Sequence, residues 1–404
     1  MGERLAKDFM STKKRVVKTK SFAPWPYFSD SEISAVTKVL RSGKVNQWGG
    51  SQVVAFEKEY AKKLGLRYAV ALVNGSVALE LALASLGIGE GDEVIVPSRT
   101  FVATASSVSL RGAVPVFCDV DRNSQLMTVD TIKNLCTPKT KAVIAVHLAG
   151  WPCELDKLRQ FCDSKNIYLI EDCAQAHGAK YKGKPVGSWG HIGCFSFCQD
   201  KIITTGGEGG LLATNDKKIW EYAWSFKDHG KDYNLATKNE KNFQFQWIIR
   251  SFGTNYRMTE MQAAIGLTML SNLDKWVKKR RSLAAVLDEG FKKFPALRVT
   301  IPDKDCFHSY YKYYVFVRPE RLKKNWGRDR ILKTLFDKGI PCGSGICPEI
   351  YLEEAFKGYN QGRLPTAKEL GETSMMFLVH PTLNKDNMNF IVKEMAEVLT
   401  LAAN

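Results

Sequence analysis

The chain has few histidines and no closely paired cysteines. Among its 404 residues there are six histidines, and its ten cysteines show no CxxC spacing. Structural zinc sites usually need such pairs, completed by further thiols or histidines, so we expect no metal centre. Most of the cysteines stand in apolar runs, which indicates free, buried thiols. Free thiols favour a reducing compartment, and the cytoplasm is the expected location.

The chain also lacks a long unbroken apolar run, and we expect no secretory leader. Its most apolar stretch, residues 69–89, contains Asn74, Ser76 and Glu80. This stretch predicts a loop and a buried helix rather than a membrane span. The first twenty residues carry seven Lys or Arg against two acids, without an apolar segment. We therefore interpret residues 1–20 as a basic flexible tail and expect no association with a membrane.

The chain has fewer acidic than basic residues, and this net positive charge favours binding to an anionic partner. The chain has 58 Lys and Arg against 42 Asp and Glu, a formal charge of +16. A nucleic-acid binder would gather this charge in a stripe with aromatic residues between. Here the charge is spread in short clusters such as residues 278–281 and 323–330. We expect no nucleic acid and favour a doubly phosphorylated small substrate, although binding through the basic tail is a weaker alternative.

Strand-like runs alternate with helical patterns through the first half of the chain. This alternation is typical of a mostly parallel sheet between two layers of helices, an α/β fold. Small polar groups and acids follow several of the runs, at the edge where open α/β sheets bind ligands. The runs are YAVALV, EVIVP, VPVFCDV, KAVIAVH, IYLIED, CFSF and GLLATN, between residues 68 and 215.

A chain of this length exceeds the size at which a single core stops growing, so two packed units are expected. Residues 258–294 predict a long helix that leads out of the first unit. We place a large domain at residues 21–275 and a smaller C-terminal α+β domain at 276–404. The polar segment 225–254 interrupts the alternation and is interpreted as a loop over the site.

Lys201 and Asp172 form the most informative pair. Asp172 ends the run IYLIED, and Lys201 follows in SFCQDKIITTGGEGG, 29 residues later. Lysine forms Schiff bases with carbonyl compounds, and an acid commonly bonds the ring nitrogen of pyridoxal phosphate (PLP). Either residue alone is more simply explained as a surface cation or a helix cap. Together they indicate a PLP site.

A turn upstream of this pair suits a phosphate group. Asn74, Gly75 and Ser76 separate a strand-like run from an apolar helical one. Backbone N–H groups at a helix N-terminus attract anions, Gly75 allows a close approach, and Ser76 adds a hydroxyl. Ser76 is also a plausible N-cap, and capping alone would explain it.

These segments together resemble the DegT/DnrJ/StrS sugar aminotransferases, PLP enzymes of fold type I, the aspartate aminotransferase fold. The resemblance covers roughly residues 22–402. Its motifs, in chain order, are NGSVALELAL, GDEVIVPSRTFVATASSV, AVHLAGWPCELDKL, IEDCAQAHGAKYKGKPVGSWGHIGCFSF, the Lys201 segment, NYRMTEMQAAIG and LVHPTL.

The resemblance implies a role for each matching position. Lys201 would hold the cofactor covalently and Asp172 would bond its pyridine nitrogen, which makes these two the catalytic residues. Asn255 would reach the phosphate of the neighbouring subunit's cofactor, so that a homodimer shares its sites. The other cofactor contacts would be Gly75, Ser76, the backbone at Val77, Phe101, Gln175 and Ser196, and the substrate residues His229, Tyr351 and His380.

The expected reaction is transamination of a nucleotide-diphosphate keto-sugar, with glutamate as amino donor, in the synthesis of a surface polysaccharide or another glycan. The sequence departs from the family at Cys198, where many members carry histidine. A branch that removes a sugar hydroxyl instead has histidine at the position of Lys201, so the lysine argues for amino transfer over dehydration. The alternatives are a PLP-dependent sugar dehydratase and a catalytically quiet PLP-binding regulator.

Overall fold

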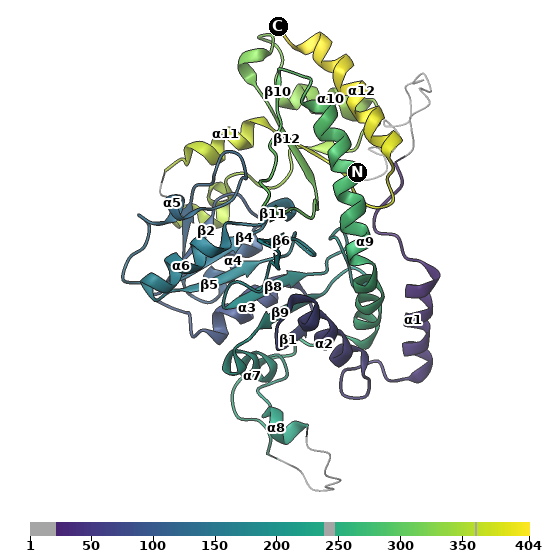
Figure 1. Ribbon diagram of the computed structural model, residues 1–404. Coiled ribbons are helices and arrows are strands. Elements are labelled where there is room, and N and C mark those ends of the chain that lie inside the picture. Colours follow the sequence, from purple (N-terminus) through teal and green to yellow (C-terminus); the bar gives the residue numbers. More distant parts are fainter. Residues whose placement is uncertain (1–21, 238–246, 360–361) are drawn as a thin grey trace, which may run out of the picture.

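In the computed structural model, which describes residues 22–237, 247–359 and 362–404, two sheets form two layers joined by a long helix (Figure 1). The predicted basic tail, residues 1–20, lies outside the described residues. The larger sheet lies at the centre of the view, and the C-terminal part of the chain packs above it.

Seven strands form the central sheet, and they correspond to the seven runs predicted from the sequence. Only β9 runs antiparallel to its neighbours, while the other pairs are parallel. Their residues are almost all buried on both faces, as apolar runs without polar alternation predict. In spatial order the strands are β1 (Tyr68–Leu72), β9 (Gly210–Thr214), β8 (Ile192–Ser196), β5 (Tyr168–Asp172), β4 (Thr140–Val146), β2 (Glu93–Pro97) and β3 (Val114–Cys118).

Helices cover both faces of this sheet and bury two separate apolar clusters. One cluster joins α2, α6 and α9 to the sheet, and the other joins α3, α4 and α7 to its opposite face. The helices of this part are α1 (Asp30–Ser42), α2 (Gln52–Leu64), α3 (Gly75–Ser85), α4 (Ala103–Leu110), α5 (Val129–Ile132), η1 (Leu148–Gly150), α6 (Leu155–Lys165), α7 (Lys217–Phe226), α8 (Tyr233–Ala236) and α9 (Glu260–Phe291).

The C-terminal part builds an antiparallel sheet with a third apolar cluster of its own. Its strands, in spatial order, are β10 (Leu297–Arg298), β12 (Tyr313–Val317), β14 (Ser374–Phe377) and β13 (Cys342–Gly343). A small sheet contains β11 (Cys306–Phe307), β6 (Lys180–Tyr181) and β7 (Lys184–Pro185). The helices are η2 (Pro319–Arg321), α10 (Arg328–Asp337), η3 (Ile350–Leu352), η4 (Glu354–Tyr359), α11 (Pro365–Thr373) and α12 (Lys385–Ala402).

The long helix α9 connects the two layers, as the pattern of residues 258–294 predicts. It spans 32 residues, which corresponds to about 48 Å. Thr259 starts it, because the Thr259 and Gln262 side chains cap each other's backbone N–H groups. The helix runs without a break through residue 275, so the domain boundary placed there stays a prediction. Among the described residues, no helix is long and apolar enough to cross a bilayer.

Candidate active site

A cavity of about 610 Å³ opens at the carboxyl ends of the central strands. It lies between the β1–α3 turn, the β2–α4 loop and the segment after β8 on one side and the start of β12 on the other. Seven of the residues predicted for the site line it. They are Gly75, Ser76, Phe101, Asp172, Gln175, Ser196 and Lys201.

The helix α3 presents its N-terminus to this cavity. Asn74, and not Ser76 as expected, is the N-cap, because the Asn74 Oδ1 accepts the Val77 N–H at 3.0 Å. The Val77 N–H thus already has a partner in this structure, and the expected phosphate contact through the Val77 backbone stays a prediction. Gly75 and Ser76 keep first-turn N–H groups that no helical carbonyl can reach.

Gly75 is required by a close approach to β8. A Cβ on Gly75 would lie 2.6 Å from the Ser196 Cβ. The absence of a side chain therefore brings the N-terminus of α3 next to the Ser196 hydroxyl, in one corner of the cavity. The two free N–H groups, the Ser76 and Ser196 hydroxyls and the helix dipole together make a site that suits a phosphate group.

Asp172 lies on the cavity wall with its carboxylate buried. Its Oδ2 accepts from the Thr104 hydroxyl at 2.8 Å, and its Oδ1 accepts from the Ala174 N–H at 3.1 Å. Burial raises the pKa of Asp172, and these hydrogen bonds oppose the rise only in part. No basic group of the described residues lies within ion-pair distance of it. A buried carboxylate without a counter-ion is costly, so this site favours a ligand with a cationic N–H.

A fixed hydrogen-bonded pair supports the strand end that carries Asp172. The His147 Nε2 lies 3.0 Å from a Glu171 oxygen, and the His147 N–H donates to the Asp172 carbonyl at 3.1 Å. The His147 Nδ1 accepts from the Cys153 N–H, so the Nε2 carries the proton that it donates to Glu171.

The same pair stands near Cys173, but it is not a metal site. The Glu171 carboxylate accepts backbone N–H groups at 2.6 to 2.7 Å from the turn at Gly187, Trp189 and Gly190. Burial raises the pKa of Cys173 well above its ordinary value, which keeps the thiol protonated. Hydrogen bonds and burial thus explain the positions of His147, Glu171 and Cys173 without a metal ion.

Lys201 projects into the cavity from the loop after β8. Its ammonium nitrogen lies 5.0 Å from the centre of the Tyr311 ring. Its carbonyl oxygen accepts the Trp25 indole N–H at 2.9 Å, so the N-terminal segment holds this loop in place. Gln175 is fixed on the opposite side, where its side-chain oxygen accepts the Ala149 N–H at 2.8 Å.

Two of the expected substrate residues are occupied elsewhere. Tyr351 is 1% exposed, packs on Phe117 and accepts the Leu364 N–H at 2.9 Å through its hydroxyl. His380 is buried against Trp25, and its Nδ1 bonds Thr382 at 2.8 Å. Burial, with the nearby Arg280 and Lys312 charges, lowers the pKa of His380 to about 3. Neither side chain lines the cavity of its own chain, and packing explains the position of each, so both substrate assignments stay predictions.

His229 and Asn255 also lie outside this cavity. Both are exposed, the His229 N–H donates to Thr254, and the Asn255 side chain accepts the Arg257 N–H at 3.3 Å. Among the described residues of segment 225–254, none lines the cavity. The described part of the expected loop, residues 225–237 and 247–254, therefore does not line the site of its own chain.

The structure adds residues that sequence reasoning did not select, one that bonds Asp172 and three that line the cavity. Thr104 follows the Phe101 motif by three residues, on the first turn of α4, and this spacing could have indicated it. Tyr311 and Lys312 stand in SYYKYYVFVRP, where the aromatic pattern indicates only a buried strand. Asp200 binds the Tyr311 hydroxyl and lies 3.4 Å from the Lys312 ammonium.

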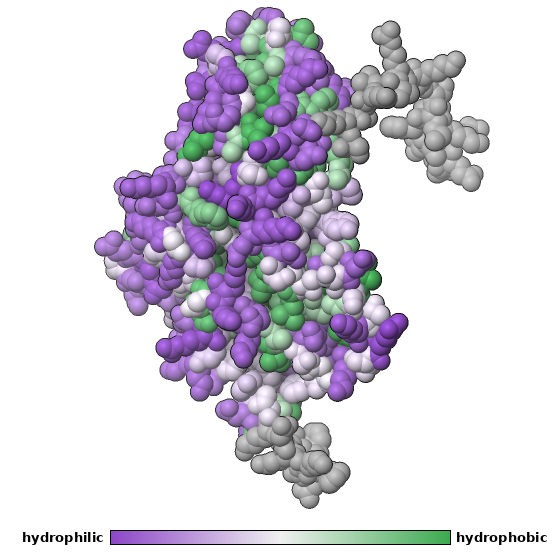
Figure 2. All heavy atoms as spheres, turned by 45° about the vertical axis from the view of Figure 1, so that its right-hand side comes forward, coloured by the Kyte–Doolittle hydropathy of each residue, from purple (hydrophilic) through white to green (hydrophobic). Residues whose placement is uncertain are grey.

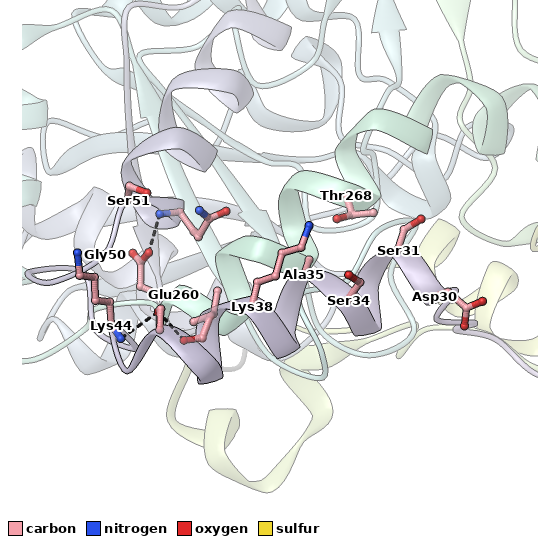
Figure 3. A pocket seen from close by; sticks show the side chains of 13 residues that line it. Asp30, Ser31, Ser34, Ala35, Lys38, Lys44, Gly50, Ser51, Glu260 and Thr268 are labelled. Atoms are coloured by element: carbon pink, nitrogen blue, oxygen red, sulfur yellow. Dashed lines mark hydrogen bonds between the residues drawn. The ribbon is translucent and has the colours of Figure 1, made fainter.

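A larger hollow of about 830 Å³ lies apart from these residues, between α1, α2 and α9 (Figure 3). Its acid, Glu260, accepts the Gln52 and Val53 N–H groups at 2.6 and 3.0 Å. Glu260 thereby caps α2, and a Cβ on Gly50 would collide with its carboxylate. Structural bonds thus explain the buried charge in this hollow.

Comparison with known proteins identifies relatives along nearly the whole chain. The family described as DegT/DnrJ/EryC1/StrS aminotransferase matches residues 26–396. A GDP-perosamine synthase of Escherichia coli O157:H7 is 35% identical, over 92% of this chain and 96% of its own.

Solved structures agree with this match. An aminotransferase from Psychrobacter cryohalolentis superposes with a TM-score of 0.92 at 48% identity, covering 94% of this chain and 99% of its own. A GDP-4-keto-6-deoxymannose-3-dehydratase with bound GDP-perosamine has a TM-score of 0.82 at 26% identity, covering 91% and 98%.

Proposed function

Because the chain belongs to the DegT/DnrJ/EryC1/StrS aminotransferase family, we propose that it moves an amino group from glutamate to a keto-sugar carried on a nucleoside diphosphate. The protein is an aminotransferase of PLP fold type I, and its cofactor is pyridoxal phosphate. The observation that carries the proposal is the cavity itself, which brings a lysine, a buried acid without a counter-ion and a free helix N-terminus together.

These residues fit the cofactor. The N-terminus of α3, with Ser76 and Ser196, would hold its phosphate, and Asp172 would accept a hydrogen bond from its protonated ring nitrogen. Phe101, which is 55% exposed at the cavity wall, would cover one face of the ring. Gln175 would lie near the ring hydroxyl. Bound there, pyridoxal phosphate supplies an aldehyde that takes up amines and a ring that accepts electrons.

The protein residues bind, orient and move protons. Lys201 would hold the cofactor, and its free Nζ would take a proton from the donor's α-carbon and return it to the carbon that bore the cofactor's aldehyde. Thr104 and the Ala174 N–H keep the Asp172 carboxylate turned toward the cavity. The charge of Asp172 would keep the ring nitrogen of the bound cofactor protonated, and burial would strengthen this interaction because water would not screen it.

We propose a GDP-linked keto-deoxysugar as the first substrate to examine, because a GDP-perosamine synthase is 35% identical to the chain. The product would enter a surface polysaccharide such as an O-antigen. All ten cysteines are free, which supports a reducing location in the cytoplasm.

The purified protein should convert GDP-4-keto-6-deoxymannose to an amino sugar when glutamate is present. We would measure the product by mass spectrometry and compare UDP- and dTDP-linked keto-sugars in parallel. A dehydratase would instead give a product that lacks a hydroxyl and no new amine. A regulator would bind the nucleotide-sugar without converting it, so either result would contradict amino transfer.

We propose a homodimer with shared sites, and the surface of segment 247–255 supports it. Ile249 and Phe252 are exposed there, and Phe252 is completely so. Figure 2 shows further hydrophobic patches among hydrophilic side chains on one face of the molecule. Exposed apolar patches commonly mark interfaces. If a partner subunit packs on this segment, Asn255 and His229 would lie near the partner's cavity. They do not reach the cavity of their own chain.

Mixing two impaired variants, at a cofactor concentration that limits Asn255→Ala, would test the shared site. In a heterodimer of Asn255→Ala with Lys201→Ala, one site would carry both changes and the other neither. We therefore expect activity to return toward half of the wild-type value per heterodimer. Asn255→Ala alone should weaken cofactor affinity several-fold, because one hydrogen bond contributes about 0.5 to 1.5 kcal/mol. Verified heterodimers without recovery would show that Asn255 acts within its own subunit.

A further inference from the structure

A second lysine lines the cavity and has no role in the reaction described above. Lys312 directly precedes β12, and its side chain is 19% exposed. Its ammonium lies 3.4 Å from an Asp200 oxygen and 4.7 Å from the centre of the Tyr311 ring. The side chain is thus held at the cavity wall, opposite the elements that carry Asp172 and the N-terminus of α3.

The Lys312 ammonium has hydrogen-bonding capacity to spare. A lysine ammonium carries three donors, and within the described part of the chain Asp200 is the only acid within 4 Å of Lys312. The same Asp200 oxygen also accepts the Tyr311 hydroxyl, so it is shared between two donors. A mostly buried cation with one long contact favours a further anionic partner.

The other charges of the cavity do not compete for this partner. Lys201 and Lys312 are the only basic residues among the described residues that line the cavity. Lys201 is assigned to the cofactor, and the phosphate site lies at α3. Arg280 is buried outside the cavity lining, where its guanidinium donates to the Tyr310 and Tyr311 carbonyls.

We propose that Lys312 forms a subsite for a carboxylate of a substrate, oriented by Asp200. The proposal rests on the proposed function, which supplies two sources of this group. Every α-amino acid donor carries a carboxylate beside the amine, and a keto-sugar acid would carry one on its ring. Both would reach the cavity in the same reaction, so the experiment must separate them.

Equilibrium binding of glutarate, a dicarboxylate without an amine, would test the subsite without any reaction. We expect Lys312→Met to weaken glutarate binding by calorimetry about 10- to 100-fold, because it removes a charge-assisted hydrogen bond. Methionine keeps the length and the packing on Tyr311. Lys312→Arg should retain most of the affinity, because it keeps the charge. Lys182→Met is the matched control, since Lys182 is half exposed and pairs with Asp156 outside the cavity.

Two further measurements would identify the source of the carboxylate. If it belongs to the donor, Lys312→Met should raise the glutamate concentration that half-depletes the cofactor's visible band. If it belongs to the sugar, this concentration should stay unchanged, and the KM of an acidic keto-sugar should rise while that of a neutral one does not. Wild-type protein whose band responds to no L-amino acid would contradict amino transfer, but glutarate binding would still report on Lys312.

Unchanged glutarate affinity in a Lys312→Met protein that retains the cofactor band would overturn the subsite. If Lys312→Met does not fold, Lys312→Gln replaces it, because the amide keeps a polar group toward Asp200 and loses only the charge. Equal weakening in Lys182→Met would also overturn it, since a general loss of positive charge would then explain the effect.

Discussion

Replacing Lys201 with alanine is expected to abolish amino transfer and the visible absorbance of the lysine-bound cofactor. Alanine has no amine to hold the cofactor covalently or to carry the proton from the donor's α-carbon. Loss of a positioned proton-transfer group alone lowers rates about 10²- to 10⁴-fold, and loss of the covalent anchor adds to this. The measurement is an absorbance spectrum of the purified variant, with amine formation from glutamate and keto-sugar followed beside it.

The structure indicates that this variant will fold. Trp25 donates to the Lys201 backbone carbonyl, which alanine keeps. The side chain makes no ion pair within 4 Å among the described residues, and its only ring contact is with Tyr311. Lys184→Ala is a suitable control, because Lys184 lies over the Trp189 ring outside the cavity. A Lys201→Ala protein with normal turnover would show that another group binds the cofactor.

The central sheet could be predicted because each strand is recognisable from a short stretch of neighbouring residues. Strands β2 and β5 are short, mostly apolar runs, and almost all of their residues are buried. The family resemblance added the cofactor residues, because Asp172 and Lys201 stand in ordered motifs at strand ends. Gly75 was predicted to allow a close approach of the main chain to a phosphate, and the structure adds a different reason for glycine there, the close approach to Ser196.

Contacts between distant segments could not be predicted in this way. Lys312 and Asp200 meet although 112 positions separate them, and an aromatic strand pattern gives no sign of the cavity beside it. Burial of single side chains is equally hidden from the sequence. The resemblance suggested a substrate contact for Tyr351, and no sequence pattern indicated that its ring packs inward against Phe117. Asn74 took the cap expected of Ser76, since two adjacent polar residues can both cap a helix and the backbone geometry decides between them.

We expect Asp172→Asn to retain the cofactor and to lose most of its turnover. An amide can still occupy the site and accept from Thr104, but it has no negative charge to keep the cofactor's ring nitrogen protonated. The rate of the half-reaction with glutamate, followed as the decay of the visible band, should fall by about 10² or more because an ionic interaction in a buried site is lost. Asp156→Asn, which changes an acid outside the cavity, should leave this rate unchanged.

Although Asp172→Asn should lower turnover, the same substitution should raise the stability of the cofactor-free protein. Burial raises the pKa of Asp172 above its ordinary 3.8, so the folded state binds the proton more tightly than the unfolded chain. The free energy of unfolding therefore falls as the pH rises from the pKa of Asp172 in the unfolded chain to its higher pKa in the folded protein. Near neutral pH, cofactor-free Asp172→Asn should melt at a higher temperature than cofactor-free wild type, and the difference should shrink as the pH falls toward 4. With cofactor bound, the cationic ring nitrogen would compensate the negative charge of Asp172. The wild type should then melt at a higher temperature than Asp172→Asn. Equal melting temperatures at all pH values, with and without cofactor, would mean that Asp172 is ordinarily solvated and does not face the ring.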